Sequence, residues 1–270
     1  MTSVRSKITA TSFGAMKKKG EKIVWLTSYD YYTARALDHA GVDGLLVGDS
    51  VNMVLYGKSD TLSATMDMML RHTDAVARGA QHALVIGDMP FGAYQSSDAD
   101  AVANACRFLS EAGAGGVKLE GGIEMAVRIK KITECGIPVF GHIGLTPQSI
   151  NKFGGYKVQG KTDAGKNYLL ESAQALEEAG CFSIVLEAMK SDIAQEISKT
   201  LTIPTIGIGA GINCDGQIMV VNDILGMNDD FVPKFVRQYM KQGELIQGAA
   251  AKFVAEVRGG KYPSESESYG

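Results

Sequence analysis

The chain has 270 residues, of which 45% are hydrophobic and 21% charged, as is typical of a folded globular protein rather than a disordered one. Its formal net charge of −3 provides no electrostatic footprint for nucleic acid or for an anionic membrane. No apolar run approaches the ~20 residues of a membrane span, and the N-terminal segment lacks the apolar stretch of a signal peptide. We therefore expect a soluble, cytoplasmic protein.

Short apolar runs bounded by Gly, Asp or Pro recur along the chain, and their length is typical of strands buried on both faces. The eight runs begin at Ile23, Gly44, Ala83, Gly115, Pro138, Phe182, Ile203 and Gln217. Segments with helical spacing lie between most of them, over 32–39, 66–78, 99–111, 124–133, 168–178 and 193–199. Eight alternating strand and helix units predict an α/β protein with a (β/α)8 TIM barrel. A doubly wound open sheet is the alternative.

No change in composition divides the chain, so we expect one domain over 1–270 with a polar, frayed tail from about 259. The pattern over 231–257 predicts a pair of extra C-terminal helices, whose apolar positions need the barrel or another subunit as a partner. The cysteines are too scattered for a C-x-x-C motif and too few for a disulfide scaffold. We expect reduced core residues at Cys106, Cys135, Cys181 and Cys214.

Acidic residues close several of the predicted strands, where the active site of such a barrel forms. Asp49, Asp88, Glu120 and Glu187 end four of the runs. One such Asp alone is typical of a helix N-cap or a turn. Several carboxylates at one rim repel one another unless a cation or a raised pKa resolves the conflict. The oxygen ligands favour Mg²⁺ or Ca²⁺, and Mg²⁺ fits better because it takes one or two carboxylates and leaves positions for a chelating substrate.

Lys118, His142 and Glu187 also lie at predicted strand ends. Lys118 precedes Glu120 by two residues, so both side chains face the barrel interior, as a structural ion pair or as an anchor for a substrate carboxylate. His142 is the histidine that ends a strand, and its alternative is a structural role. Glu187 closes an apolar strand, where it suits a general base or acid, or a buried and hydrogen-bonded carboxylate.

Two glycine-rich segments require comparison with nucleotide-binding motifs. Residues 155–162 satisfy the pattern G-x-x-x-x-G-K-[ST], but the polar stretch before them does not predict the strand that a P-loop follows. Residues 207–211 lack the third glycine of a dinucleotide-binding motif and follow the seventh run instead of the first. A P-loop NTPase therefore stays an alternative, although the sequence does not predict the strand that a P-loop requires before it.

Segments along nearly the whole chain resemble the ketopantoate hydroxymethyltransferase family in order and spacing. They are LTSYD at 26–30, VGDS at 47–50, DMPFGAY at 88–94, VKLEGG at 117–122, GHIGLTPQ at 141–148, GGYKVQGKT at 154–162, VLEA at 185–188, and GIGAG followed by DGQ over 207–217. The resemblance implies transfer of a hydroxymethyl group from 5,10-methylenetetrahydrofolate to 3-methyl-2-oxobutanoate. The product is 2-dehydropantoate, an intermediate of pantothenate and coenzyme A biosynthesis, and the reaction passes through a Mg²⁺-stabilised enolate.

The resemblance also implies roles for individual residues. The metal ligands are Asp49, Asp88 and Glu120, the catalytic base is Glu187, and the oxo-acid contacts are Asp49, Ser50, Asp88, Lys118 and His142. Val51 and Asn52 depart from the family pattern, in which Leu-Gly is common, directly beside Ser50. The implied assembly is a homo-oligomer, commonly a decamer, with folate as co-substrate and with no nucleic-acid or membrane partner.

Two other functions stay open at this point. A Mg²⁺-dependent lyase or mutase of the phosphoenolpyruvate mutase and isocitrate lyase kind shares both the barrel and enolate chemistry, so the fold does not separate it. The segments GHIGLTPQ and GGYKVQGKT favour the hydroxymethyltransferase. From another class, a catalytically silent barrel would bind a small oxo-acid or hold a partner protein. The acidic strand ends argue against it.

Overall fold

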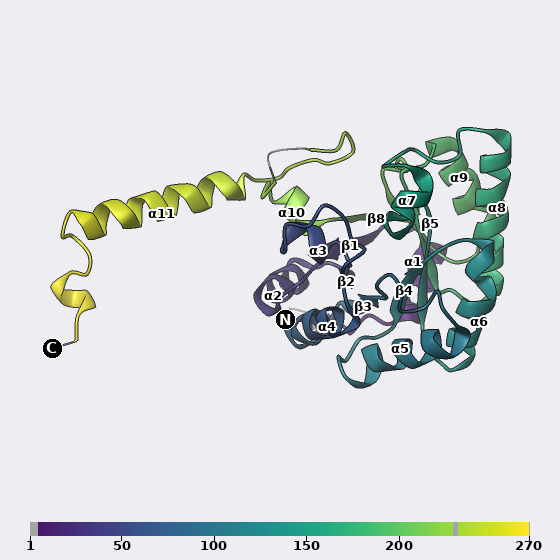
Figure 1. Ribbon diagram of the computed structural model, residues 1–270, viewed down its shortest axis with the longest axis horizontal. Helices are drawn as coiled ribbons and strands as arrows, with labels where there is room; N and C mark the ends of the chain where they lie inside the picture. Colours follow the sequence, from purple (N-terminus) through teal and green to yellow (C-terminus); the bar gives the residue numbers. More distant parts are fainter. Residues whose placement is uncertain (1–4, 229–231, 270) are drawn as a thin grey trace. The chain divides into compact units, whose positions relative to one another are not determined.

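Eight parallel strands close into a barrel in chain order, from β1 to β8 and back to β1 (Figure 1). The computed structural model describes residues 5–228 and 232–269. The strands are β1 (Ile23–Thr27), β2 (Gly44–Val47), β3 (Leu84–Asp88), β4 (Val117–Glu120), β5 (Val139–Gly144), β6 (Ser183–Glu187), β7 (Thr205–Ile208) and β8 (Gly216–Met219). The predicted (β/α)8 barrel is confirmed, and the open doubly wound sheet is excluded.

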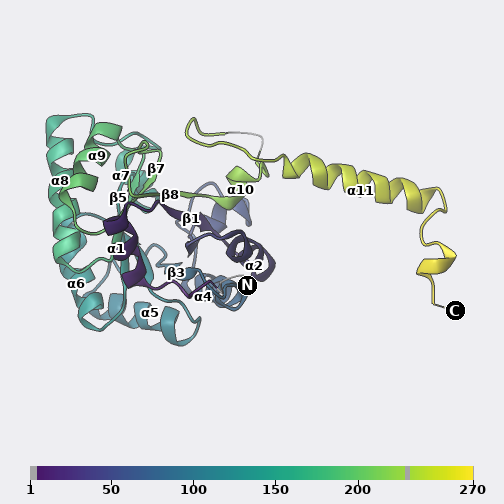
Figure 2. The same cartoon turned by 180° about the vertical axis from the view of Figure 1, so that it is seen from behind.

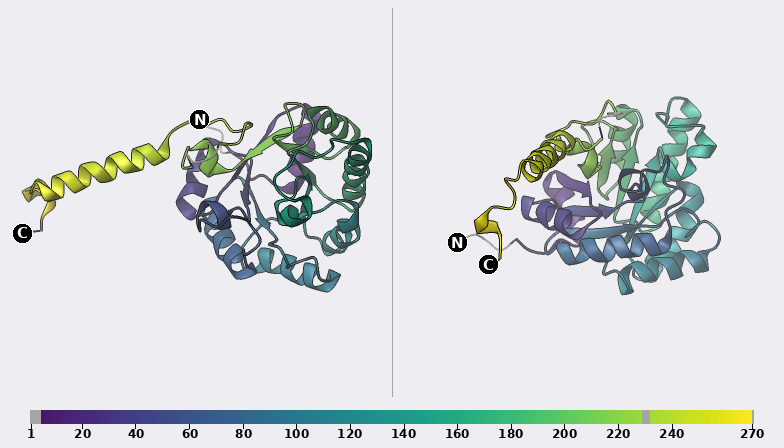
Figure 3. Two further views of the ribbon diagram at one scale, coloured as in Figure 1. Left: turned by 45° about the horizontal axis from the view of Figure 1, so that its top comes forward. Right: turned by 60° about the vertical axis from the view of Figure 1, so that its left-hand side comes forward.

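Helices surround the strands on the outside of the barrel (Figure 3). They include α2 (Tyr31–Ala40), α4 (Met66–Gly79), α5 (Asp98–Ser110), α6 (Ala126–Glu134), α8 (Asp163–Glu178) and α9 (Ser191–Thr200). Four of them begin after a residue whose side chain accepts a backbone N–H of the first turn, which satisfies a donor that the helix itself leaves unpaired. These N-caps are Asp30, Thr65, Ser97 and Thr162. All six helices overlap the segments predicted from helical spacing.

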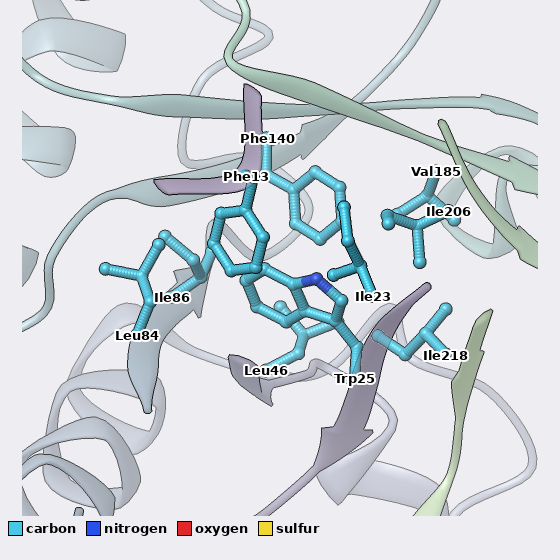
Figure 4. Close-up of a cluster of buried hydrophobic side chains, with 10 residues drawn as sticks. All are labelled: Phe13, Ile23, Trp25, Leu46, Leu84, Ile86, Phe140, Val185, Ile206 and Ile218. Atoms are coloured by element: carbon cyan, nitrogen blue, oxygen red, sulfur yellow. The ribbon is translucent and has the colours of Figure 1, made fainter. Parts of the chain in front are cut away.

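An additional helix, α1 (Ala10–Lys19), precedes the first strand (Figure 2). It contributes Phe13 to the core. The Phe13 ring is fully buried and stacks on Trp25 with a centroid distance of 5.1 Å, and Trp25 lies 4.8 Å from Phe140 (Figure 4). Gly44 faces the Trp25 indole so closely that a Cβ atom there would overlap the ring. The sequence pattern did not predict α1, because Phe13 is its one buried residue and three lysines end the helix.

Beyond the barrel, contacts within the chain group the residues from Val220 onward as a second compact unit. This unit contains α10 (Val221–Ile224) and the long helix α11 (Gln242–Arg258). The predicted extra C-terminal helices are confirmed. Within the described residues 232–257, however, α11 is the helical part and residues 232–241 form turns and loops. Pro233 lacks an N–H group and disfavours helical backbone at Val232, so a helix does not continue through this position.

The prediction that all cysteines lie in the core is only half right. Cys181 and Cys214 are buried, whereas Cys106 and Cys135 are exposed, and all four are free thiols. The buried positions of α5 are Ala101, Ala105 and Phe108, so Cys106 falls on the outer face of that helix. No helix in the described part of the chain combines the length and apolarity that crossing a membrane requires.

Candidate active site

Six polar residues meet at the carboxyl ends of β2 to β6, and we call them the rim cluster: Asp49, Asp88, Lys118, Glu120, His142 and Glu187. Strand register brings them together, because Asp88 pairs with Lys118 and Glu120 pairs with His142 across neighbouring strands. Apart from Glu187, whose side chain is 18% exposed, each of them is at most 5% exposed. The barrel thus gathers ionisable groups at one end, as the sequence predicted.

Lys118 lies among the acids of the rim cluster. Its Nζ atom is 2.8 and 2.9 Å from the two carboxylate oxygens of Asp88 and 3.2 Å from Glu120 Oε1. Burial lowers the pKa of Lys118, but Asp88, Glu120 and Asp49 outweigh that effect and raise it above its ordinary value. Burial raises the pKa of Glu120, but Lys118 and His142 outweigh it and lower the pKa to about 2. Lys118 and Glu120 are therefore both charged at neutral pH.

His142 stands between two carboxylates. Its Nδ1 atom is 3.5 Å from Glu120 Oε1, and its Nε2 atom is 3.2 Å from Glu187 Oε2. Burial and Lys118 lower the pKa of His142, but Glu120 and Glu187 outweigh them and raise it to about 9. Neither ring nitrogen has a partner in hydrogen-bond geometry among the described residues. The ring is thus charged at neutral pH, and each of its two N–H groups lies near one of these carboxylates without a hydrogen bond.

The pKa values of Asp49 and Asp88 are both raised. Burial, followed by Asp88 and Glu120, raises the pKa of Asp49 well above its ordinary value. Burial also raises the pKa of Asp88, although Lys118 opposes the shift. In the described part of the chain, the Asp49 carboxylate accepts a hydrogen bond from Gln148 Nε2 at 2.9 Å and forms no ion pair. The site therefore holds more negative charge than its own cations offset.

The chain is similar to known proteins over nearly its whole length. The sequence model of the ketopantoate hydroxymethyltransferase family matches residues 7–265. The chain belongs to this family. It is 54% identical over 263 residues to the 3-methyl-2-oxobutanoate hydroxymethyltransferase of Syntrophus aciditrophicus (strain SB), with 97% of each chain covered. It is 52% identical to the protein of the same name from Dehalococcoides mccartyi, with 97% of this chain and 93% of that one covered.

Solved structures of other enzymes share the barrel of this ketopantoate hydroxymethyltransferase family member. Phosphonopyruvate hydrolase superposes with a TM-score of 0.62 at 14% identity, covering 97% of this chain and 92% of that chain. For 2,3-dimethylmalate lyase, the TM-score is 0.58 at 15% identity, covering 96% and 91%. At such identities the likeness establishes the fold alone.

Ser50, the remaining residue assigned through the family, follows Asp49 and precedes the short helix α3 (Val51–Val54). Its Oγ atom lies 2.8 Å from the hydroxyl of Tyr29. The family departure at Val51 and Asn52 gives the chain a buried amide, because Asn52 Nδ2 donates to Asp60 O at 2.8 Å and to Ser63 Oγ at 2.9 Å. Asn52 therefore fastens the loop that follows α3.

The segment GGYKVQGKT follows α7 (Ile150–Phe153) and leads into α8, so no strand precedes it and the P-loop interpretation fails. Its Gln159 N–H donates to the Ala188 carbonyl at 2.8 Å, directly after Glu187. The Tyr156 hydroxyl lies 3.8 Å from Met53 Sδ. In this family member the segment thus contacts both the loop after β6 and α3.

Two residues of the site, Tyr94 and Gln148, were missed by the sequence analysis. Gln148, in the 3-10 helix η2 (Pro147–Ser149), contacts Asp49 and Glu120, and the Tyr94 hydroxyl contacts Gln148 Oε1 at 2.7 Å. Both lie in segments that carry the family resemblance, which was the available signal. Neither residue is an acid or a base at the end of a strand, so the pattern of ionisable strand ends did not indicate them.

Proposed function

We propose that the protein transfers a hydroxymethyl group from 5,10-methylenetetrahydrofolate to 3-methyl-2-oxobutanoate. One water supplies the hydroxyl oxygen, and the products are 2-dehydropantoate and tetrahydrofolate. The observation that carries the proposal is the family match over residues 7–265, which contains every residue of the rim cluster. Relatives that are named for this activity are 52–54% identical to the chain.

We propose Mg²⁺ as the required cation, held by Asp49, Asp88 and Glu120. The donor set fits this ion, because Mg²⁺ prefers carboxylate oxygens and the three buried acids outnumber the one lysine among them. In the described residues, no three His, Cys, Asp or Glu side chains are already spaced as ligands of one ion, and Lys118 Nζ lies between Asp88 and Glu120. When bound, Mg²⁺ supplies Lewis-acid stabilisation of the negative charge that develops on the oxo-acid.

The chain's own residues would bind the oxo-acid and move its proton. Lys118 is assigned to the substrate carboxylate, and Ser50, Asp49 and Asp88 are assigned as further contacts of the oxo-acid. His142 is assigned as a donor to a substrate oxygen, since its ring nitrogens lack hydrogen-bond partners among the described residues. Glu187 is assigned as the base that removes the proton from carbon 3, and the 18% exposure of its side chain is consistent with access to substrate.

The test of the activity is an assay with 3-methyl-2-oxobutanoate, methylenetetrahydrofolate and Mg²⁺, repeated with EDTA. We expect 2-dehydropantoate only when both substrates and the metal are present. Absence of product under all conditions refutes the proposal. Turnover of oxo-acids or phosphonates without folate would instead identify a lyase or mutase of the related barrel enzymes.

The base role of Glu187 has a separate test in exchange of the carbon 3 proton with deuterated water. We expect Glu187→Gln to slow this exchange by about 10²- to 10⁴-fold, the usual contribution of general base catalysis. Glu196→Gln is the matched control, because Glu196 lies on α9 and pairs with Lys166 at 2.7 Å, outside the rim cluster. Exchange at the parent rate in Glu187→Gln would remove the assignment.

We also propose that the chain forms a homo-oligomer, with a decamer as the family expectation. In support, α11 exposes five large apolar side chains within its own unit: Leu245, Ile246, Phe253, Val254 and Val257. Sedimentation at micromolar concentration tests the assembly, and a species of one chain only would contradict it. The cytoplasmic location stays a prediction.

A further inference from the structure

We propose that Gln148 is a positioning residue that fixes the orientation of the acids at the rim, and that Tyr94 acts through it. The inference rests on the proposed function, because Asp49, Asp88 and Glu120 are the acids assigned to Mg²⁺. Gln148 is 5% exposed, Tyr94 is 1% exposed, and each has its side chain committed to contacts within the site.

The side-chain amide of Gln148 has hydrogen-bond partners for both its nitrogen and its oxygen. Nε2 donates to Asp49 Oδ2 at 2.9 Å and to Met89 O at 3.0 Å, while Oε1 accepts from the Tyr94 hydroxyl at 2.7 Å and from Gln95 Nε2 at 3.2 Å. This pattern assigns the amide orientation, since the opposite one would place Oε1 against a carboxylate and a carbonyl. All four hydrogen-bonding positions of the amide are used.

The backbone of Gln148 adds a contact to a second acid. Its N–H group donates to Glu120 Oε2 at 3.0 Å, whereas Glu120 Oε1 faces Lys118 at 3.2 Å. Gln148, which follows β5, thus contacts both Asp49 after β2 and Glu120 on β4. It also contacts the carbonyl of Met89, the residue directly after Asp88. These contacts fix the acids from three different strand ends relative to one another.

Tyr94 ties the same residue to the backbone of β4. Its hydroxyl oxygen accepts the Glu120 N–H at 3.1 Å, and Gln148 Oε1 at 2.7 Å is the nearer acceptor for its single proton. The amide of Gln148 therefore cannot rotate without breaking the Tyr94 contact as well. This buried chain of hydrogen bonds holds Asp49 Oδ2 against the Gln148 amide before any ligand arrives.

Residues that orient metal ligands in this way change metal affinity or activity by about 10- to 100-fold when they are replaced. Gln148→Met keeps the length of the side chain and removes its amide hydrogen bonds. We expect it to weaken Mg²⁺ binding at least 10-fold in a calorimetric titration without substrates. We also expect kcat to fall by about 10- to 100-fold while KM for the oxo-acid changes less.

Tyr94→Phe and the double variant test the link between the two residues. We expect Tyr94→Phe alone to weaken Mg²⁺ binding by a smaller factor, and to add less than twofold when it is combined with Gln148→Met. Ser172→Ala is the matched control, since the fully buried Ser172 hydroxyl accepts the Ile123 N–H at 3.2 Å, shortly after β4, and has no hydrogen bond to an acid of the rim cluster. It should leave Mg²⁺ affinity unchanged, and thermal unfolding of every variant reports on folding.

The outcomes separate this inference from the proposed function. A parent protein that turns over substrate and binds Mg²⁺, with Gln148→Met binding it within twofold of the parent, overturns the inference alone. A parent that binds no Mg²⁺ refutes the metal part of the proposed function and the inference with it. An equal loss of affinity in Ser172→Ala would assign the effect to general loosening of the rim, which also overturns it.

Discussion

Replacing Lys118 tests the charge balance of the rim cluster directly. Lys118→Met keeps most of the apolar stem and removes the ammonium group that lies 2.8 Å from Asp88 and 3.2 Å from Glu120. Both acids and the lysine are at most 5% exposed, so water replaces the lost cation poorly. Removing one partner of a buried ion pair costs about 3–5 kcal/mol. We expect a loss in the free energy of unfolding at the lower end of that range at pH 7.

The loss stays at the lower end because Asp88 or Glu120 can take up a proton once the ammonium group is gone. A carboxyl with the ordinary pKa of 4.5 takes up a proton at pH 7 at a cost of about 3.4 kcal/mol, at about 1.36 kcal/mol per pH unit. At pH 5, the same step costs about 0.7 kcal/mol. In the variant, the folded carboxyl has a pKa above its unfolded value, so stability returns as the pH falls toward 4.5 and is lost as it rises. The deficit should therefore shrink from about 3 kcal/mol at pH 7 to below about 1 kcal/mol at pH 5.

Urea unfolding at pH 5 and pH 7 in EDTA measures both values by linear extrapolation. Lys166→Met is the matched control, because Lys166 pairs with Glu196 at 2.7 Å with both side chains at least 40% exposed. An exposed pair contributes about 0–1 kcal/mol, so we expect a small deficit at both pH values. Equal deficits for Lys118→Met at the two pH values would refute the reasoning, since the cost would then not come from the unpaired carboxylates.

Three further replacements have defined outcomes. Asp49→Asn should abolish turnover and Mg²⁺ binding, which a calorimetric titration checks. It should also raise the free energy of unfolding by about 1 kcal/mol in urea, because burial and neighbouring acids raise the pKa of Asp49 and so disfavour its charged form. Asp38→Ala should cost about 3 kcal/mol at pH 7, since the buried carboxylate accepts the N–H groups of Gln81, His82 and Ala83. Burial raises the pKa of Asp38 but those bonds lower it on balance, so the deficit should shrink in urea unfolding below pH 3.8. Phe13→Ala should cost about 3–5 kcal/mol in thermal unfolding without changing kcat.

The barrel was predictable because its strands are short, apolar and buried on both faces, which sets them apart from the amphipathic helices between them. The same rule failed for α1, where a single buried aromatic residue leaves no periodic pattern. It also failed for residues 232–241, where the apolar spacing suggested a helix but the chain around Pro233 forms turns and loops. Hydrophobic pattern alone does not account for such local backbone restrictions.

The rim cluster was predictable as a location because strand ends in a parallel barrel converge at one end. Its internal contacts were not, since the distance between Gln148 and Asp49 depends on how the loops after β5 and β2 fold. The neutral amide of Gln148 also gives no sign in the sequence that it belongs to a site, whereas a carboxylate at the end of an apolar strand does. The roles of the site residues, Mg²⁺, the decamer and the single domain over 1–270 stay predictions.

Closure of the barrel joins distant parts of the chain, since Ile23 on β1 pairs with Gly216 on β8. The interior around Phe13 and Trp25 includes Ile206 and Ile218, so it is complete only after β8 has been made. At about 5–20 residues per second, the ribosome needs roughly 10–40 s to add the intervening residues. During that interval the nascent chain carries an unpaired strand edge and an unburied indole, the two features that favour aggregation of a chain that has not finished folding.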